Sequence, residues 1–227
     1  MYDKTETIKL IELMKRISAI DYFKACNVLS LVDILNTYDN GDIPDSIPKN
    51  ILSDSYYTRD MIIKACGFSV ISMDWIRILS KYLYGLRGLE IMAGKGALSK
   101  ALQDCGISVI CTDSYSWESD NDYSDWRSHF TEIEQISAMD AVIKYGADID
   151  FIICSWSCGS SFVEALDKLH EINPNCEIIY IGENESGCTA DDMFFDTYNI
   201  LPFTDVNEIY PQFQHIHDLV YYAIRKK

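Results

Sequence analysis

The chain has 227 residues, with 35 acidic and 19 basic side chains and a formal net charge of −16. Such a surface repels phosphate backbones, and nucleic-acid affinity depends mainly on Lys and Arg contacts, so generic DNA or RNA binding is disfavoured. No stretch reaches the roughly 18 uninterrupted apolar residues that a membrane span needs. Charges run through the first 16 residues, where a signal peptide needs an apolar segment, so we expect a cytoplasmic protein.

Residues 1–84 are predicted to form an N-terminal helical segment. Apolar side chains recur at helical spacing, and helices are predicted over 7–20, 22–38, about 58–66 and 72–83. A loop at 39–55, which contains Asn-Gly and two prolines, separates the second helix from the third. Gly67 is expected to end the third helix in the left-handed conformation, and Ser72 to cap the fourth.

Residues 85–227 show a different pattern, in which short apolar runs alternate with helical periodicity. Strands are predicted at 88–92, 107–112, 150–156, 177–182 and 218–225, with a weak one at 129–134, and helices at 97–104, about 138–146, 160–171 and near 190–198. Alternating strands and helices indicate a parallel sheet covered on both faces. The fold class is therefore α/β, a doubly wound, Rossmann-like, mostly parallel sheet preceded by the helical segment.

A glycine turn follows the first predicted strand, in the segment Leu89–Ser99. Gly94 and Gly96 allow a tight turn and the close approach of a ligand, and the next helix presents unpaired amide groups towards it. Asp113 ends the next strand, 19 residues after Gly94, where a carboxylate can accept both hydroxyls of a ribose. The unit predicts an adenosine-like ligand, and the alternative is a tight turn without one. Ser99 breaks the dinucleotide pattern and weakens an NAD interpretation.

The segment from Glu90 to Gly96, together with Asp113, resembles the class I S-adenosylmethionine-dependent methyltransferases over about residues 85–225. The phrases LEIMAGKGALSKAL, SW at 155–156, IYIGE with GCTADD, and HDLVYYAI resemble a poorly characterised bacterial, phage and fungal group within them. Met92 departs from the family pattern, which has a glycine there. Residues 155–158, Ser-Trp-Ser-Cys, replace the Pro-Pro pair of amino-methylating relatives, which argues against amino methylation of a base.

The resemblance implies S-adenosylmethionine as cofactor and an antiparallel final strand. It also implies roles for individual residues: Glu90 near the methionine amino group, Ala93, Gly94 and Gly96 along the methionine and ribose path, Asp113 on the ribose hydroxyls, Ser114 and Tyr115 beside the adenine, Asp140 near the adenine amino group, and Ser155 and Trp156 beside the sulfonium. Trp156 is either a substrate platform or a packing residue.

Methyl transfer needs in-line positioning of a nucleophile and exclusion of water, because the sulfonium is already activated. An oxygen or nitrogen nucleophile would also benefit from a base, and Glu183, Glu185 and Tyr115 are the candidates at strand ends. The alternative for Glu183 is a solvated loop acid. The acidic, aromatic stretch 115–126 is either a surface loop or a lid that brings Trp117, Tyr123 or Trp126 over the pocket.

Eight cysteines and four histidines give no clear metal or disulfide pattern. The chain lacks a CxxC pair, and the spacing of Cys154 and Cys158 has no matching second pair, so neither zinc nor a disulfide framework is expected. Cys158 is an inert thiol or, alternatively, a nucleophile. The segment 187–192 is interpreted as a turn and a helix capped by Thr189, or as a wall of the acceptor site.

These observations favour an S-adenosylmethionine-dependent methyltransferase acting on a small molecule or a protein. The second hypothesis is an S-adenosylmethionine- or nucleotide-binding protein without transferase activity, which would act as a sensor, inhibitor or partner module. An NAD-linked enzyme is a third. The sequence leaves the acceptor and the oligomeric state open.

Overall fold

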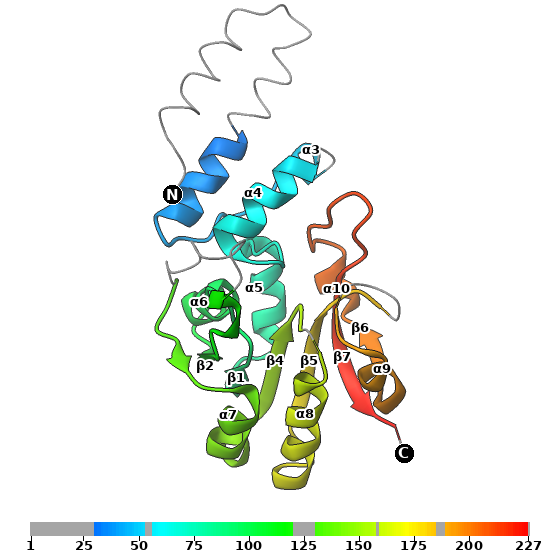
Figure 1. The fold of residues 1–227 in the computed structure, drawn as a ribbon. Coiled ribbons are helices and arrows are strands. Elements are labelled where there is room, and N and C mark those ends of the chain that lie inside the picture. The colour runs from blue at the N-terminus through cyan, green and yellow to red at the C-terminus, as the bar shows by residue number, and fades with distance from the viewer. Residues whose placement is uncertain (1–29, 53–55, 120–129, 158, 185–188, 227) are drawn as a thin grey trace, which may run out of the picture.

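A computed structural model of the protein describes residues 30–52, 56–119, 130–157, 159–184 and 189–226. Its centre is a seven-stranded sheet with helices on both faces (Figure 1). The strands are β1 (Arg87–Glu90), β2 (Ser108–Asp113), β3 (Glu134–Gln135), β4 (Phe151–Ser155), β5 (Glu177–Gly182), β6 (Tyr198–Pro202) and β7 (Leu219–Arg225). Their order is β3-β2-β1-β4-β5-β7-β6. Strand β7 runs antiparallel to β5 and β6, so the expected fold class and the antiparallel final strand are confirmed.

Most helices follow the predicted pattern, but Lys49–Leu52 is helical within the loop predicted at 39–55, and Thr204–Asn207 is helical where no helix is predicted. Residues 30–39 are helical, and the other α-helices are α3 (Lys49–Leu52), α4 (Tyr56–Cys66), α5 (Met73–Tyr82), α6 (Ala97–Asp104), α7 (Ala138–Tyr145), α8 (Ser161–Ile172), α9 (Asp192–Thr197) and α10 (Thr204–Asn207). Among the described residues, Ser116–Ser119 (η1) and Gly146–Asp148 (η3) are 3-10 turns. The helix predicted at 7–20 lies outside the described residues.

The predicted cap at Ser72 is confirmed in position, although its hydroxyl makes no capping hydrogen bond, and the predicted cap at Thr189 is wrong. Ser72 occupies the N-cap position of α5, but the Asp74 carboxylate accepts the N–H of Trp75 while Ser72 donates to that carboxylate. Helix α9 is capped by Asp191, which accepts the N–H of Phe194. Thr189 is instead buried, and its hydroxyl accepts the N–H of Glu183 at 2.8 Å. In both cases a carboxylate inside the segment is a better acceptor than the hydroxyl residue that the pattern favoured.

Strand β6 falls in a stretch for which the sequence predicts no strand. It pairs only with β7 at the sheet edge, and most of its residues are at least partly exposed. Since neither face of such a strand needs a continuous row of apolar side chains, the sequence lacks the alternation that identifies a strand. Pro202 lies at its end, a position that an edge strand tolerates.

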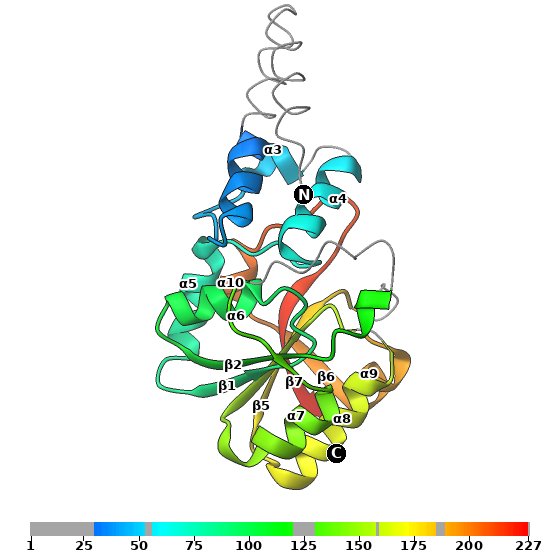
Figure 2. The same cartoon turned by 60° about the vertical axis from the view of Figure 1, so that its left-hand side comes forward.

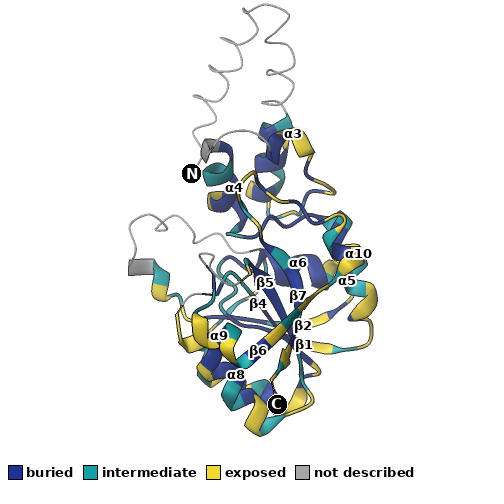
Figure 3. Ribbon diagram, turned by 90° about the vertical axis from the view of Figure 1, so that its right-hand side faces the viewer, coloured by how far each residue is buried: buried dark blue, intermediate teal, exposed yellow. Residues whose placement is uncertain are grey.

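Alternate residues of each central strand point to opposite faces of the sheet. In β4, Phe151 and Ile153 belong to the apolar cluster shared with α5 and α6, while Ile152 and Cys154 pack with residues of α7 and α8. Both clusters are buried, and exposed residues lie on the outer surfaces of the helices, in loops and on the edge strand β6 (Figure 3). This double burial explains why β4 appears in the sequence as a continuous apolar run.

The described part of the N-terminal segment shares its core with the sheet. Leu35, Ile62 and Trp75 belong to the same apolar cluster as Phe151 and Val220. Helices α3 and α4 lie beyond the carboxyl ends of the parallel strands, and α5 packs beside α6 (Figures 1 and 2). The domain boundary placed between residues 84 and 85 stays a prediction, although it falls between α5 and β1. No helix among the described residues is long and apolar enough to cross a membrane.

Strand β1 lies at the point where the order of the sheet reverses. The chain proceeds from β1 outward to β2 and β3, then returns to β4 on the other side of β1. The loops that follow β1 and β4 therefore diverge, and this opens a crevice at the carboxyl ends of the strands, the usual place for a ligand in such sheets.

Candidate active site

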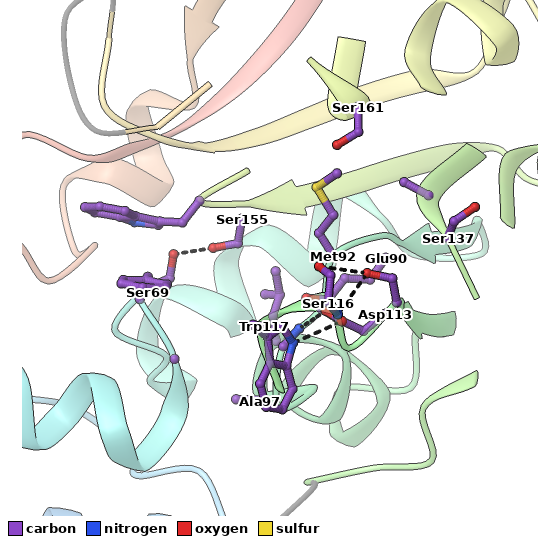
Figure 4. A pocket seen from close by; sticks show the side chains of 18 of the residues that line it. Ser69, Glu90, Met92, Ala97, Asp113, Ser116, Trp117, Ser137, Ser155 and Ser161 are labelled. Carbon is purple, nitrogen blue, oxygen red and sulfur yellow. Dashed lines mark hydrogen bonds between the residues drawn. The ribbon is translucent and has the colours of Figure 1, made fainter. Parts of the chain in front are cut away.

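A cavity of about 650 Å³ lies at this crevice, within the size range of ligand pockets (Figure 4). Its walls come from the ends of β1, β2 and β4, the first turns of α6, α7 and α8, and the loop after α4. The residues predicted from the sequence that line it are Glu90, Ala93, Gly94, Asp113, Ser114, Ser155 and Trp156, whereas Gly96, Tyr115, Asp140 and Glu183 do not. The structure thus brings together residues that lie up to 66 positions apart, from Glu90 to Trp156.

The glycine turn is a sharply wound stretch of backbone. Met92, Gly94 and Gly96 have positive φ angles of 56°, 57° and 76°. The N–H of Gly94 donates to Oδ2 of Asp113 at 2.7 Å, which ties the turn to the end of β2. Glycine is favoured at position 96 by its positive φ angle, and a Cβ there would also make a tight contact, 3.2 Å from Sγ of Cys111. Gly96 therefore shapes the turn without lining the cavity.

Asp113 is the centre of a set of hydrogen bonds at the end of β2. Only 4% of the residue is exposed. Its Oδ1 accepts the N–H of Tyr115 at 2.6 Å and the indole N–H of Trp117 at 3.1 Å, while Oδ2 accepts from Gly94. These donors fix the carboxylate beside the cavity. Trp117 lies against Tyr115 in an edge contact, with 5.5 Å between ring centroids.

Glu90 is a buried acid that joins β1 to the first turn of α6. Its Oε2 accepts the N–H of Ser99 at 2.9 Å and also pairs with the Ser99 hydroxyl. Burial raises the pKa of Glu90 to about 7, against the opposing effect of the two Ser99 hydrogen bonds. The carboxylate is therefore balanced between its two protonation states near neutrality. Burial likewise raises the pKa of Cys111, whose thiol lies near this acid.

The end of β4 packs against the N-terminal segment. The Ser155 hydroxyl pairs with that of Ser69, and Trp156 stacks on Phe68 with 5.7 Å between ring centroids and 17° between ring planes. The Trp156 indole donates to Oδ2 of Asp218 at 3.1 Å. Trp156, at a φ of 52°, is thus both a packing residue and part of the cavity wall.

Lys95 connects the glycine turn to helix α4. Only 5% of it is exposed, and its ammonium donates to the carbonyls of Ala65 at 2.7 Å and Lys64 at 3.1 Å. These carbonyls belong to the last turn of α4, where a cation is stabilised by the helix dipole. Burial lowers the pKa of Lys95. The side chain holds the loop after α4 in place as a wall of the cavity.

Three of the predicted residues away from the cavity make local contacts instead. Asp140 belongs to the capping arrangement of α7, where its N–H donates to the hydroxyl of Ser137 and its carboxylate accepts from that hydroxyl. Glu183 accepts the N–H of His217 at 3.1 Å. Tyr115 contributes its N–H to Asp113. The functional roles of Gly96, Tyr115, Asp140 and Glu183 stay predictions.

Several cavity residues had not been assigned a role from the sequence. Those on the sheet domain are Met92, Ala97, Leu98, Ser116, Ser137, Ala138, Met139, Ser161 and Glu164, and those of the N-terminal segment are Cys66, Gly67, Phe68, Ser69 and Ile71. Residues of the first group follow strand ends or begin helices, and this place in the sequence could have identified them as candidate site residues. Trp117 lines the cavity, as the lid hypothesis requires, while Tyr123, Trp126, Cys158 and Glu185 lie outside the described residues.

No group of three or more His, Cys, Asp or Glu side chains suited to a metal ion occurs in the part of the chain that the structure describes. Cys66, Cys105, Cys111, Cys154 and Cys176 are free thiols. The pKa of Cys66, which lines the cavity, is raised to about 11 by burial, so this thiol stays protonated near neutral pH.

No family model and no curated protein matches the sequence. Among solved structures, similar folds include the magnesium protoporphyrin IX methyltransferase of Synechocystis with bound SAM (12% identity, 78% of this chain, 89% of that chain, TM-score 0.42). A second is a TehB-like SAM-dependent methyltransferase of Corynebacterium glutamicum (17% identity, 75% of this chain, 96% of that chain, TM-score 0.42). A third is a SAM-dependent methyltransferase of Archaeoglobus fulgidus (14% identity, 76% of this chain, 100% of that chain, TM-score 0.43). These identities and scores are low, and the fold assignment rests on the strand order.

Proposed function

We propose that this chain is an S-adenosylmethionine-dependent methyltransferase that acts on a small molecule or a protein. The observation that carries the proposal is the hydrogen bond between Gly94 and Asp113 beside the cavity. It joins the glycine turn after β1 to the acid at the end of β2, and this is the pairing expected of an adenosine site at a topological switch point.

The residues around the cavity suit such a cofactor. Asp113 presents a carboxylate for ribose hydroxyls, and Glu90 presents a second carboxylate on the neighbouring strand. The cofactor carries a sulfonium and an amino group, and the charged side chains among the described lining residues, Glu90, Asp113 and Glu164, are all acidic. When bound, the cofactor supplies an activated methyl group.

The chain's own contribution would be positioning and exclusion of water. Trp117 and Trp156 supply apolar surface at separate parts of the wall, and the Gly67–Ile71 loop covers the carboxyl end of β4. Such a site holds an acceptor in line with the methyl group, which is the main requirement of the reaction. Since the charged lining is acidic, the acceptor is proposed to be a small molecule or a protein side chain instead of a nucleic acid.

A second candidate function is a cofactor-binding protein without transferase activity. Glu183, proposed as a base from the sequence, lies away from the cavity and binds the backbone of His217. An acceptor that requires strong deprotonation would therefore lack this assistance. A sensor or partner module would retain the cavity and need no base.

Calorimetry on the purified chain tests whether it binds the proposed cofactor. S-adenosylmethionine and S-adenosylhomocysteine should both bind with one site per chain, and NAD should not. Binding of NAD alone would contradict the proposal and favour the third hypothesis. Turnover with a labelled methyl donor and a cell extract then separates the two remaining functions. A labelled small molecule or protein supports the transferase, and complete absence of label supports the binding module.

A further inference from the structure

The Asp113 carboxylate receives at least three hydrogen bonds from the chain itself. Its Oδ1 accepts the N–H of Tyr115 at 2.6 Å and the indole N–H of Trp117 at 3.1 Å, and its Oδ2 accepts the N–H of Gly94 at 2.7 Å. A carboxylate offers about four lone-pair positions, shared equally between its two oxygens. The donors therefore fill both positions of Oδ1 and one of the positions of Oδ2.

A ribose needs more of this carboxylate than the single position that is left. The two vicinal hydroxyls of the sugar are both donors, and the proposed adenosine site directs both of them to Asp113. At most one of them can be accepted while the three donors of the chain stay in place. One of these donors must therefore leave Asp113 before both hydroxyls can bind.

Trp117 is the donor that can leave. The donors of Gly94 and Tyr115 are backbone N–H groups, placed by the glycine turn and by the end of β2. The Trp117 donor belongs to a half-buried side chain of the turn η1 that lines the cavity, and its hydrogen bond is the longest of the three. Figure 4 shows the indole nitrogen directed at the Asp113 carboxylate. Rotation of this one side chain releases a position on Oδ1 without a change in the backbone.

We propose that the Trp117 indole and a ribose hydroxyl compete for Oδ1 of Asp113, so that the cofactor must displace the indole in order to bind. This inference rests on the proposed function, because the competing hydroxyls belong to S-adenosylmethionine. A ligand binds the fraction of chains in which the indole has turned away, and its apparent affinity falls in proportion to that fraction. The competition favours ligands with vicinal hydroxyls, because only they replace the hydrogen bond that the indole gives up.

A single substitution separates this competition from a role of Trp117 as apolar wall. Trp117→Phe keeps a flat aromatic ring and removes the N–H donor. A side chain that only contributed apolar surface would leave the affinity for the cofactor unchanged or lower it after this substitution, since the smaller ring covers less of the ligand. A competing donor, in contrast, predicts that its removal tightens binding.

Calorimetry with S-adenosylhomocysteine on the full chain tests the proposal. Trp117→Phe should bind about tenfold more tightly than wild type, the scale of one hydrogen bond to a charged group. Trp156→Phe is the matched control, because it removes an indole donor from a different carboxylate, that of Asp218, and it should not tighten binding. Equal or weaker binding by Trp117→Phe, or equal tightening by both variants, overturns the inference and leaves the proposed function standing. Absence of binding by both wild type and Trp117→Phe counts against the proposed function, and the inference falls with it.

The indole N–H resonance of Trp117 in a nitrogen-15 NMR spectrum gives a second measurement, and its loss in Trp117→Phe identifies it. In wild type, saturating S-adenosylhomocysteine should shift this resonance and speed its exchange with water, because the N–H leaves Asp113. The indole of Trp75 is the internal control, since it is fully buried, donates to the carbonyl of Val70 and does not line the cavity. A Trp117 resonance that keeps its position and its exchange rate at saturation overturns the inference, even if the affinities differ.

Discussion

Met92, Tyr115 and Trp156 have left-handed backbone conformations, with φ angles of 56°, 57° and 52°. Each lies one or two residues after the end of a parallel strand, β1, β2 or β4. Side chains other than glycine adopt this conformation at a cost on the order of 1 kcal/mol or more per residue. The surrounding structure must supply enough contacts to hold these three residues in this conformation. Because they gather at one edge of the sheet, they support a site whose backbone is already organised before a ligand binds.

The buried Glu90 carboxylate makes stability depend on pH. Its pKa is raised from an ordinary value of 4.5 to about 7 in the folded chain, so folding favours the protonated form. This contribution is fully present below pH 4.5 and is lost as the pH rises to 7. We expect Glu90→Gln to be more stable than wild type at pH 8, by about 1–3 kcal/mol.

Urea unfolding of both proteins between pH 4 and pH 8 measures this effect. The difference in the free energy of unfolding should grow with pH, because only the wild type must bury an ionised acid. The Gln side chain keeps an oxygen to accept from Ser99. A constant difference across this range would contradict the assignment of the shifted pKa to Glu90.

Asp113 is expected to be the residue on which cofactor affinity depends most directly. Asp113→Ala should weaken S-adenosylmethionine by about 1–3 kcal/mol, the scale of a hydrogen bond to a charged group, as measured by calorimetry. Asp140→Ala removes the same charge from an acid that does not line the cavity, so its affinity should match the wild type. Equal affinities in all three proteins would show that the ribose assignment is misplaced.

At the scale of the elements, the contact between α4 and the glycine turn is the distinctive feature. Helix α4 ends at Cys66, and the ammonium of Lys95 supplies donors for its last carbonyls. Without these donors the carbonyls would lose charge-assisted hydrogen bonds in a nearly dry position. Cys66, at the end of the helix, and Gly94, in the turn, are 28 positions apart in the sequence. The helix and the turn therefore stabilise each other.

We expect Lys95→Met to lower the free energy of unfolding by about 1–2 kcal/mol, because the apolar stem is kept but the donors are lost. Lys100→Met is the control, since Lys100 forms a surface pair with Asp104 that contributes less than about 0.5 kcal/mol. Chemical denaturation followed by circular dichroism measures both. Equal effects of the two substitutions would mean that α4 is stabilised independently of the turn.

At the scale of the whole molecule, one apolar cluster spans the described N-terminal helices and the sheet. Trp75 of α5 is fully buried and meets the Tyr210 ring at 5.1 Å between centroids, while its indole donates to the carbonyl of Val70. A shared core of this kind makes independent unfolding of the two parts unfavourable. We therefore expect one cooperative transition.

Leu79→Ala tests this expectation from within α5, because Leu79 is fully buried. The substitution should cost about 2–5 kcal/mol and move the whole transition. Tryptophan fluorescence and far-ultraviolet circular dichroism should continue to report the same midpoint. Ser80→Ala, at the surface of the same helix, should stay within about 0.5 kcal/mol of wild type. Separation of the two probes in Leu79→Ala would indicate two independently folding units.

The sheet was largely predictable from the sequence, because buried parallel strands need apolar runs that pattern analysis detects. The bounds of the 97–104 helix and of the 177–182 strand agree with the structure. Strand β6 was missed since an exposed edge imposes no such pattern. The part of the cavity that follows β1 and β2 was predictable because Glu90, Gly94 and Asp113 occupy fixed positions relative to the first two strands.

The part of the cavity at the end of β4 was less accessible to sequence reasoning. Ser69 and Ser155 are 86 positions apart, and nothing in the local pattern of either indicates that they meet. The same holds for Trp156 and Asp218, which depend on β4 and β7 being separated by a single strand. Such contacts follow from the packing of the N-terminal segment on the sheet, and pattern analysis does not specify that packing.

The acids around the cavity also bear on how quickly a ligand arrives. A molecule with a net charge of −16 and three acids in the cavity lining draws cations from solution and slows the approach of anions. Association of cationic ligands is consequently fastest at low ionic strength and declines as added salt shortens the reach of the field. Discrimination between metabolites thus begins during diffusion, before any of them touches the protein.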